Sequence, residues 1–119
     1  MGTNKKIVET YMGCKGTEYA SFLADDVELI EWADGVPASG VRTQGRDAFV
    51  LNRGTREYQT QITRMIEENN VVIAEGIAFG AKKDGGNWRV QFCNIFELEN
   101  GKVKRLTSYG ADVKNATDK

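Results

Sequence analysis

Histidine is absent from the 119 residues of this chain, which also contains only one proline and two cysteines. Without an imidazole the chain can form neither a Ser-His-Asp nor a Cys-His catalytic group, and it lacks the ligands of the usual zinc sites. Acid-base chemistry would have to use Asp, Glu, Tyr, Lys or Cys side chains. We therefore expect neither a metal site nor a bound cofactor.

Long apolar runs are also missing. The first ten residues hold no apolar segment typical of a signal peptide, and no later stretch approaches the roughly 18 apolar residues of a membrane span. Cys14 and Cys93 are far apart and have no CxxC spacing, which favours buried thiols over a disulfide in a reducing compartment. These features predict a cytoplasmic protein that does not contact a membrane.

Charge of one sign is not concentrated in any part of the chain. The 16 basic and 17 acidic residues nearly cancel and are interspersed, so we expect no surface that attracts nucleic acid. A chain of this length buries roughly two thirds of its unfolded surface in one core. Residues 1–119 are therefore expected to form a single domain.

The order of periodic segments predicts an α+β fold. The expected elements are a helix ending near Gly13, a helix capped by Thr17, a strand at 25–32, an irregular loop at 34–45, a helix at 46–56 with Ala48, Phe49 and Asn52 inward, and strands at 58–67, 70–83, 87–98 and 102–113. Short turns rich in Gly and Asn join the last four strands, as in hairpins. We expect a curved, largely antiparallel sheet with the helices on one face.

The stretch DDVELIEW at 25–32 raises the question of what Glu31 does. Strand alternation places Glu31 on the same face as Val27 and Leu29. An ionised carboxylate is costly to bury, so Glu31 is either an acid placed in an apolar pocket or a strand-end residue that reaches water or an arginine such as Arg42 or Arg46.

Two further polar residues lie on apolar faces. Asn94 interrupts an otherwise apolar strand face that contains Trp88, Val90, Phe92, Phe96 and Leu98. Tyr11 shares the apolar face of the first helix with Ile7, Val8 and Met12. Each has a structural alternative, because a buried Asn can bind a neighbouring backbone group and a core Tyr can donate to a carbonyl.

These motifs resemble a known family. The runs FLADDVELIEW, GRDAF and FELENGKVKRLTSYGADV, in this order of elements, are similar to the nuclear transport factor-2-like superfamily, and within it to ketosteroid isomerase and SnoaL-like proteins. The resemblance covers essentially residues 4–113. It implies a single cone-shaped, cystatin-like domain in which a curved antiparallel or mixed sheet wraps three N-terminal helices around an apolar pocket.

The resemblance also implies roles for three catalytic residues. VETY resembles the stretch whose tyrosine donates a hydrogen bond to the substrate oxygen, which falls on Tyr11, and ADDVELIE resembles the stretch with the general base, which falls on Glu31. The second oxyanion donor falls on Asn94 if one turn is a residue shorter here, and otherwise on Cys93. Alternation favours Asn94, because Cys93 faces outward.

The predicted function is proton transfer next to a carbonyl in a small apolar substrate, with the pocket wall formed by Trp32, Phe49, Trp88, Phe92 and Phe96, and with Tyr109 as a further candidate that could equally be a half-solvated strand residue. One alternative is a binding or association domain without catalysis. Another is a hydrolase, dehydratase or polyketide cyclase of the same superfamily. Apolar groups expected on the outer sheet face, among them Ile30, Cys93, Ile95 and Leu106, predict a homodimer.

Overall fold

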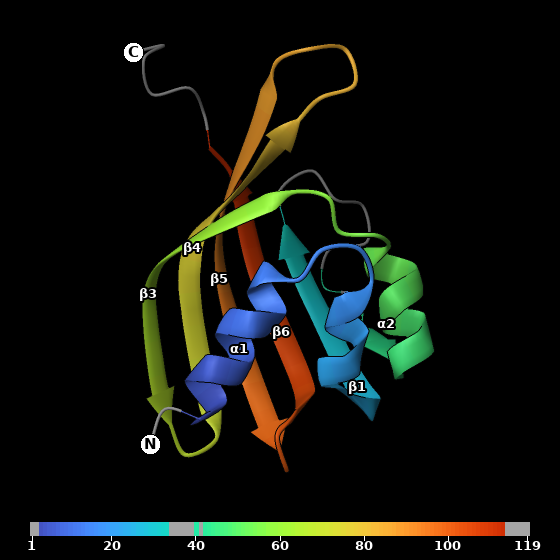
Figure 1. The fold of residues 1–119 in the computed structure, drawn as a ribbon, viewed down its shortest axis with the longest axis vertical. Helices are drawn as coiled ribbons and strands as arrows, with labels where there is room; N and C mark the ends of the chain where they lie inside the picture. Colours follow the sequence, from blue (N-terminus) through green and yellow to red (C-terminus); the bar gives the residue numbers. More distant parts are fainter. Residues whose placement is uncertain (1–2, 34–39, 41, 114–119) are drawn as a thin grey trace.

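Six strands form one curved sheet in the order β2-β1-β6-β5-β4-β3 in the computed structural model of the chain (Figure 1), which describes residues 3–33, 40 and 42–113. The strands are β1 (Leu23–Ala33), β2 (Arg42–Gln44), β3 (Gln59–Glu68), β4 (Val71–Ala81), β5 (Asn87–Glu99) and β6 (Lys102–Asp112). Neighbouring strands are antiparallel except β1 and β6, which are parallel. The predicted curved, mixed sheet is confirmed.

The helices lie on one face of this sheet. They are α1 (Thr3–Gly13), the 3₁₀ helix η1 (Glu18–Phe22) and α2 (Arg46–Arg53). Helix α1 packs on β3 and β4, whereas α2 packs on β1 and β2 (Figure 1). The prediction of three helices is corrected to two α-helices and one 3₁₀ helix, because the Ala20 N–H bonds the Thr17 carbonyl three residues back, and Thr17 makes no side-chain cap.

Two local predictions were wrong. Helix α2 ends at Arg53 because Gly54 adopts a φ of 68°, which lies outside the helical range, and Phe49 is buried while Ala48 and Asn52 are exposed. The predicted loop at 34–45 ends in strand β2, whose residues 42–44 pair with β1. Residues 34–39 and 41 of that loop lie outside the described part of the chain.

The tight turns between strands are built from asparagine and glycine. Asn69 and Asn70 join β3 to β4 with φ values of 51° and 67°, and Asn100 and Gly101 join β5 to β6 with 54° and 78°. Two successive positive φ values are the mark of type I′ hairpin turns. The predicted hairpins are confirmed at both places.

One row of four large side chains closes the core on the concave face. Its members are neighbours on β1, β6, β5 and β4, and we call them the closed row: Leu29, Leu106, Phe96 and Val72. All four are fully buried. Leu106 was expected on the outer face, but a β-bulge shifts the β5–β6 register between the pairs at Leu98 and Glu97, so alternation counted from Val103 assigns it to the wrong side.

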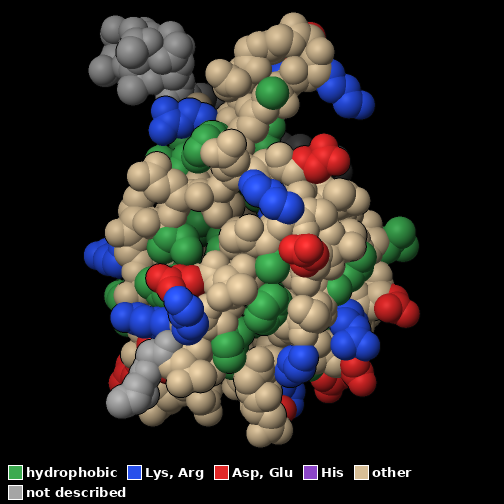
Figure 2. Space-filling model, viewed as in Figure 1, with side chains coloured by type: hydrophobic (Ala, Val, Ile, Leu, Met, Phe, Trp, Pro, Cys, Tyr) green, Lys and Arg blue, Asp and Glu red, His purple; other side chains and the backbone are tan. Residues whose placement is uncertain are grey.

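Charged side chains of both signs are scattered over the helical face of the molecule (Figure 2). No large area of a single sign interrupts them in this view. The space-filling surface thus agrees with the interspersed charges of the sequence.

Candidate functional site

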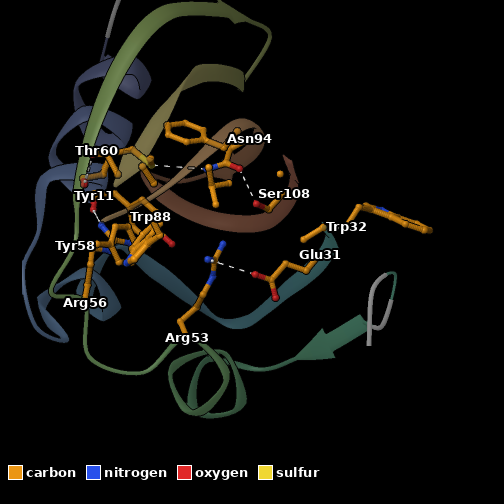
Figure 3. A pocket seen from close by; sticks show the side chains of 16 residues that line it. Tyr11, Glu31, Trp32, Arg53, Arg56, Tyr58, Thr60, Trp88, Asn94 and Ser108 are labelled. Carbon is orange, nitrogen blue, oxygen red and sulfur yellow. Dashed lines mark hydrogen bonds and ion pairs between the residues drawn. The ribbon is translucent and has the colours of Figure 1, made fainter. Parts of the chain in front are cut away.

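A cavity of about 210 Å³ opens on the concave face beyond the closed row. Strands β1, β3, β4, β5 and β6 line it, together with α1, the end of α2 and the segment that follows α2 (Figure 3). Its wall is largely apolar, and its charged lining residues are Glu31, Arg53 and Arg56. Apolar walls with a few convergent polar groups are typical of small-molecule sites.

The sheet register brings three polar side chains together. Glu31 on β1 is the neighbour of Ser108 on β6, and Ser108 is the neighbour of Asn94 on β5. We call these three residues the polar row. Glu31 and Asn94 therefore line the same cavity although they belong to strands from opposite halves of the chain.

Small residues make room next to the polar row. On the following row along the same face, Ala33 pairs with Gly110, and Gly110 pairs with Phe92. All three line the cavity. With only one large side chain across these three strands, the sheet cannot fill the space in front of it, and a cavity remains.

Asn94 is held by its neighbour. The Ser108 hydroxyl donates to Asn94 Oδ1 at 2.7 Å, while among the described residues Asn94 Nδ2 has only the Met12 sulfur within reach, at 4.0 Å. Because the amide oxygen is occupied, the NH₂ group is fixed as a donor on the cavity side. A thioether is a weak acceptor, so this donor can bind a ligand oxygen instead.

Glu31 forms an ion pair with Arg53, with Nη1 and Oε2 separated by 3.4 Å (Figure 3). The arginines named as alternative partners, Arg42 and Arg46, bind Glu28 and Asp25 instead. Glu31 thus both lines the cavity and meets an arginine, so the two alternatives raised by the sequence hold together.

Tyr11 lies in the centre of an aromatic group. Its ring packs edge-on against Tyr19 and Phe96, with centroids 5.9 and 5.4 Å apart. Burial raises the pKa of the Tyr11 hydroxyl, and the nearby Arg53 and Arg56 only partly oppose this. The group therefore stays protonated at neutral pH and can act as a hydrogen-bond donor.

The hydroxyls of two neighbouring tyrosines, Tyr19 and Tyr11, differ in their hydrogen bonding. Tyr19 donates to the carbonyl of Gly54, as expected of a core tyrosine. Within the described residues, no hydrogen bond is found for the Tyr11 hydroxyl, although Tyr11 lines the cavity. Tyr11 is therefore the tyrosine that can bind a ligand.

Arg56 is buried beneath the cavity with only 6% of its surface exposed. Its guanidinium lies 4.8 Å from the ring centroids of Tyr11 and Tyr19 and 5.8 Å from that of Tyr58. Nη1 donates to the Tyr11 carbonyl oxygen. In the part of the chain that the structure describes, no carboxylate forms an ion pair with Arg56.

Some of the residues predicted for the pocket wall line the cavity. Trp88 and Phe92 line the cavity, and Trp88 is seated against the Tyr58 ring at 5.7 Å. Trp32 borders the cavity, but 46% of it is exposed and its ring extends away from Glu31 (Figure 3). This agrees with its position on the opposite strand face from Glu31.

Three other predicted wall residues lie elsewhere, which corrects the prediction. Phe49 and Phe96 are fully buried in the core, where they pack on Tyr19 and Tyr11, respectively. Tyr109 is 45% exposed and pairs with the outward-facing Cys93 on the convex face. Apolar character alone does not distinguish a core position from a cavity wall, because both kinds of position lie on the same concave face of the sheet.

Sequence reasoning missed Arg53, Arg56 and Ser108. Ser108 carried a signal, since it is a polar residue between Leu106 and Gly110 on one strand face, but the bulge concealed that face. The two arginines lie at the end of α2 and just after it. No periodic pattern extends across this helix end, so no local signal places their side chains.

The described residues contain neither a metal-binding cluster of side chains nor a membrane-spanning helix. No three of their His, Cys, Asp and Glu side chains are grouped so as to hold a metal ion. None of the described helices is long and apolar enough to cross a membrane.

Comparisons with known proteins concern the family and the fold of the chain. The family model of the SnoaL-like domain matches residues 6–106. No curated protein matches the sequence.

Solved structures share the fold at low sequence identity. A protein of Jannaschia sp. CCS1 assigned as a SnoaL-like polyketide cyclase has a TM-score of 0.76 at 13% identity, over 91% of this chain and 85% of its own. A protein of Kribbella flavida assigned as a ketosteroid isomerase has 0.72 at 18%, over 95% and 81%. An LEH-like epoxide hydrolase of M. tuberculosis has 0.70 at 18%, over 91% and 82%. At such identities the likeness shows the fold.

Proposed function

The chain belongs to the family of SnoaL-like domains, and we propose that it is an enzyme that moves a proton next to the carbonyl of a small, largely apolar substrate. One observation carries this proposal. A carboxylate, a phenol and an amide, from Glu31, Tyr11 and Asn94, line one cavity with largely apolar walls. A base and two oxyanion donors that line one largely apolar cavity form the arrangement that enolate chemistry needs.

The proposed step uses only these side chains. Glu31 removes a proton from the carbon next to the carbonyl, and the C–H electron pair forms the C=C bond of an enolate while the carbonyl π pair moves to oxygen. The Tyr11 hydroxyl and Asn94 Nδ2 donate hydrogen bonds to that oxygen. In a β,γ-unsaturated ketone the enolate is conjugated with the neighbouring C=C bond as a dienolate. Glu31 then returns the proton to the γ-carbon, the oxygen pair re-forms the C=O bond, and the remaining C=C bond lies next to the carbonyl, so the product is an isomer and no co-reactant is consumed.

The size of the cavity limits the substrate. At about 210 Å³ it is smaller than the roughly 300–1,000 Å³ of most ligand pockets. We therefore expect a compact compound, such as one with a single ring. Trp88, Phe92 and Tyr58 supply the aromatic surface for that ring.

The test measures the turnover of cyclohex-3-en-1-one by two variants with substitutions on β1. Conversion of this compound to the conjugated ketone is followed by ultraviolet absorbance. Glu31→Gln removes the base and should lower kcat by about 10²- to 10⁴-fold while leaving the affinity for this neutral ketone nearly unchanged. Glu28→Gln is the matched control, because Glu28 also pairs with arginines but does not line the cavity. Wild-type turnover in Glu31→Gln would overturn the proposal.

A second candidate is a binding domain without catalysis. The observation that favours it is the Glu31–Arg53 ion pair, which occupies the carboxylate before any substrate enters. In that case small ring compounds bind to the wild-type protein and no ketone is converted. A hydrolase, dehydratase or cyclase would use the same carboxylate on water or on another acidic proton, and product analysis by mass spectrometry separates these reactions.

We also propose that the convex sheet face binds a second copy of the chain. Its support is a row of five neighbouring, mostly apolar side chains across β3, β4, β5, β6 and β1: Ile66, Ile73, Ile95, Thr107 and Ile30. Ile66 is 50% exposed. Sedimentation analysis should give twice the chain mass of 13.2 kDa, and Ile73→Lys should give the monomer. A wild-type monomer at micromolar concentration contradicts this proposal.

A further inference from the structure

Among the described residues that line the cavity, the charges do not balance. Two guanidiniums, of Arg53 and Arg56, line it together with one carboxylate, that of Glu31. The surplus is one positive charge in a cavity with largely apolar walls. An unpaired buried charge is costly, and proteins keep one where a ligand supplies the opposite charge.

The single carboxylate is also a poor match for its arginine. The Glu31–Arg53 separation of 3.4 Å is longer than the roughly 2.7–2.9 Å of a strong charged hydrogen bond. Arg53 Nε is buried and has no hydrogen-bond partner among the described residues. Arg53 thus retains donor capacity that Glu31 does not use.

Arg56 has donors free for a ligand as well. Its guanidinium carbon lies over the rings of Tyr11, Tyr19 and Tyr58, and the guanidinium carries five N–H donors. A ring face is only a weak hydrogen-bond acceptor, so a ligand oxygen is a stronger partner for these N–H groups. The described residues accept one hydrogen bond from its side chain, at the Tyr11 carbonyl, and Arg56 borders the cavity.

We propose that the ligand of this cavity carries a carboxylate, which binds the in-plane N–H groups of Arg56 with help from Arg53. A planar guanidinium and a carboxylate match in geometry, and burial strengthens their attraction. The inference rests on the proposed function in placing the substrate in the same cavity, and it narrows that substrate to a small keto acid.

The positions of the charges suit such a molecule. Arg56 and Glu31 lie on opposite sides of the cavity in Figure 3, with Arg53 between them in that view. A carboxylate held at Arg56 leaves the rest of a one-ring compound extending toward Glu31 and the polar row. Anchoring one end of the substrate in this way orients the reacting carbon at the base.

The experiment measures binding and needs no turnover. Benzoate and benzamide share a ring and a carbonyl oxygen but differ in charge, and their Kd values are measured by calorimetry. Benzoate should bind at least about tenfold more tightly to the wild type. Arg56→Gln should abolish this preference and Arg53→Gln should reduce it, whereas Arg89→Gln, an exposed arginine outside this cavity, should leave it unchanged.

Glu31→Gln should change the affinity for benzoate in the opposite direction to the arginine substitutions. Removing the one carboxylate among the described lining residues increases the positive charge of the cavity, so benzoate should bind more tightly to Glu31→Gln than to the wild type. If Arg56→Gln does not fold, as judged by circular dichroism, Arg53→Gln and Glu31→Gln still decide the question. Equal binding of benzoate and benzamide, or a preference unaffected by Arg53→Gln, overturns the inference.

The two proposals fail separately. The turnover assay uses a neutral ketone and the binding assay uses compounds that are not converted. A benzoate preference with full turnover in Glu31→Gln keeps the carboxylate site and removes the catalytic role. Loss of turnover in Glu31→Gln without a benzoate preference does the reverse.

Discussion

Two rows of side chains on the same sheet face differ in packing, because one lies in the closed core and the other lies at the cavity. The closed row consists of large aliphatic and aromatic side chains that are fully buried: Leu29, Leu106, Phe96 and Val72. Four residues further along β1, β6 and β4, and four residues back along β5, the equivalent row contains mostly small residues: Ala33, Gly110, Phe92 and Gly76. The strands and the face are the same, and the small side chains of Ala33 and Gly110 leave room for the cavity that the large side chains of the closed row do not.

The polar row lies at the boundary between the two. Glu31, Ser108 and Asn94 are flanked by the closed row on one side and by the small row on the other. Each has a partner on the sheet or on α2, and Glu31 and Asn94 each retain capacity toward the cavity. Polar groups are tolerated there because partners and a ligand can satisfy them.

The largest effect on stability is expected from shortening a valine to alanine in the closed row, compared with the same substitution on the cavity wall. Val72→Ala removes two methyl groups from the closed row and should lower the free energy of unfolding by about 2–3 kcal/mol, because a void replaces them. Val90→Ala, on the cavity wall, should cost about 1 kcal/mol or less, since one side of Val90 already faces open space. Urea unfolding measures both, and equal losses would remove the distinction between the regions.

Enlarging an alanine on β4 should show the same contrast in stability and should also affect ligand binding. Ala74→Leu adds volume beside Asn94 in the packed part and should destabilise the protein by about 1–3 kcal/mol. Ala78→Leu is the matched change on the cavity wall, where the new side chain fills the void. It should alter unfolding little but weaken benzoate binding by at least about tenfold. Unchanged binding in Ala78→Leu would show that ligands enter elsewhere.

The smallest effect concerns the boundary itself. Ser108→Ala removes the donor to Asn94 Oδ1 and should cost about 1 kcal/mol of stability. Because the amide can then turn its oxygen toward the cavity, turnover of the neutral ketone should fall about tenfold. Thr107→Ala, on the opposite face of β6, is the control and should leave turnover near the wild-type value. An active Ser108→Ala would mean that Asn94 needs no support.

Much of the fold was predictable because the signals are local. Alternation over 87–98 identified Asn94 as the polar residue on a buried face, and paired Asn and Gly residues identified the hairpin turns. Where a local rule is broken, prediction failed. The bulge on β6 reversed the assignment of Leu106 and hid Ser108, and the helix end after Arg53 left two arginines without a pattern.

The sequence was enough to predict which residues share a strand face, because a period of two depends only on neighbouring residues. It was also enough to isolate Tyr11, Glu31 and Asn94 as polar groups on apolar faces. Only the tertiary structure placed β1 in parallel register with β6, and so aligned Glu31 with Ser108 and Asn94. The tertiary structure alone also directs the side chains of Arg53 and Arg56 toward the same cavity. Such contacts join distant segments, and the packing of the whole chain decides them.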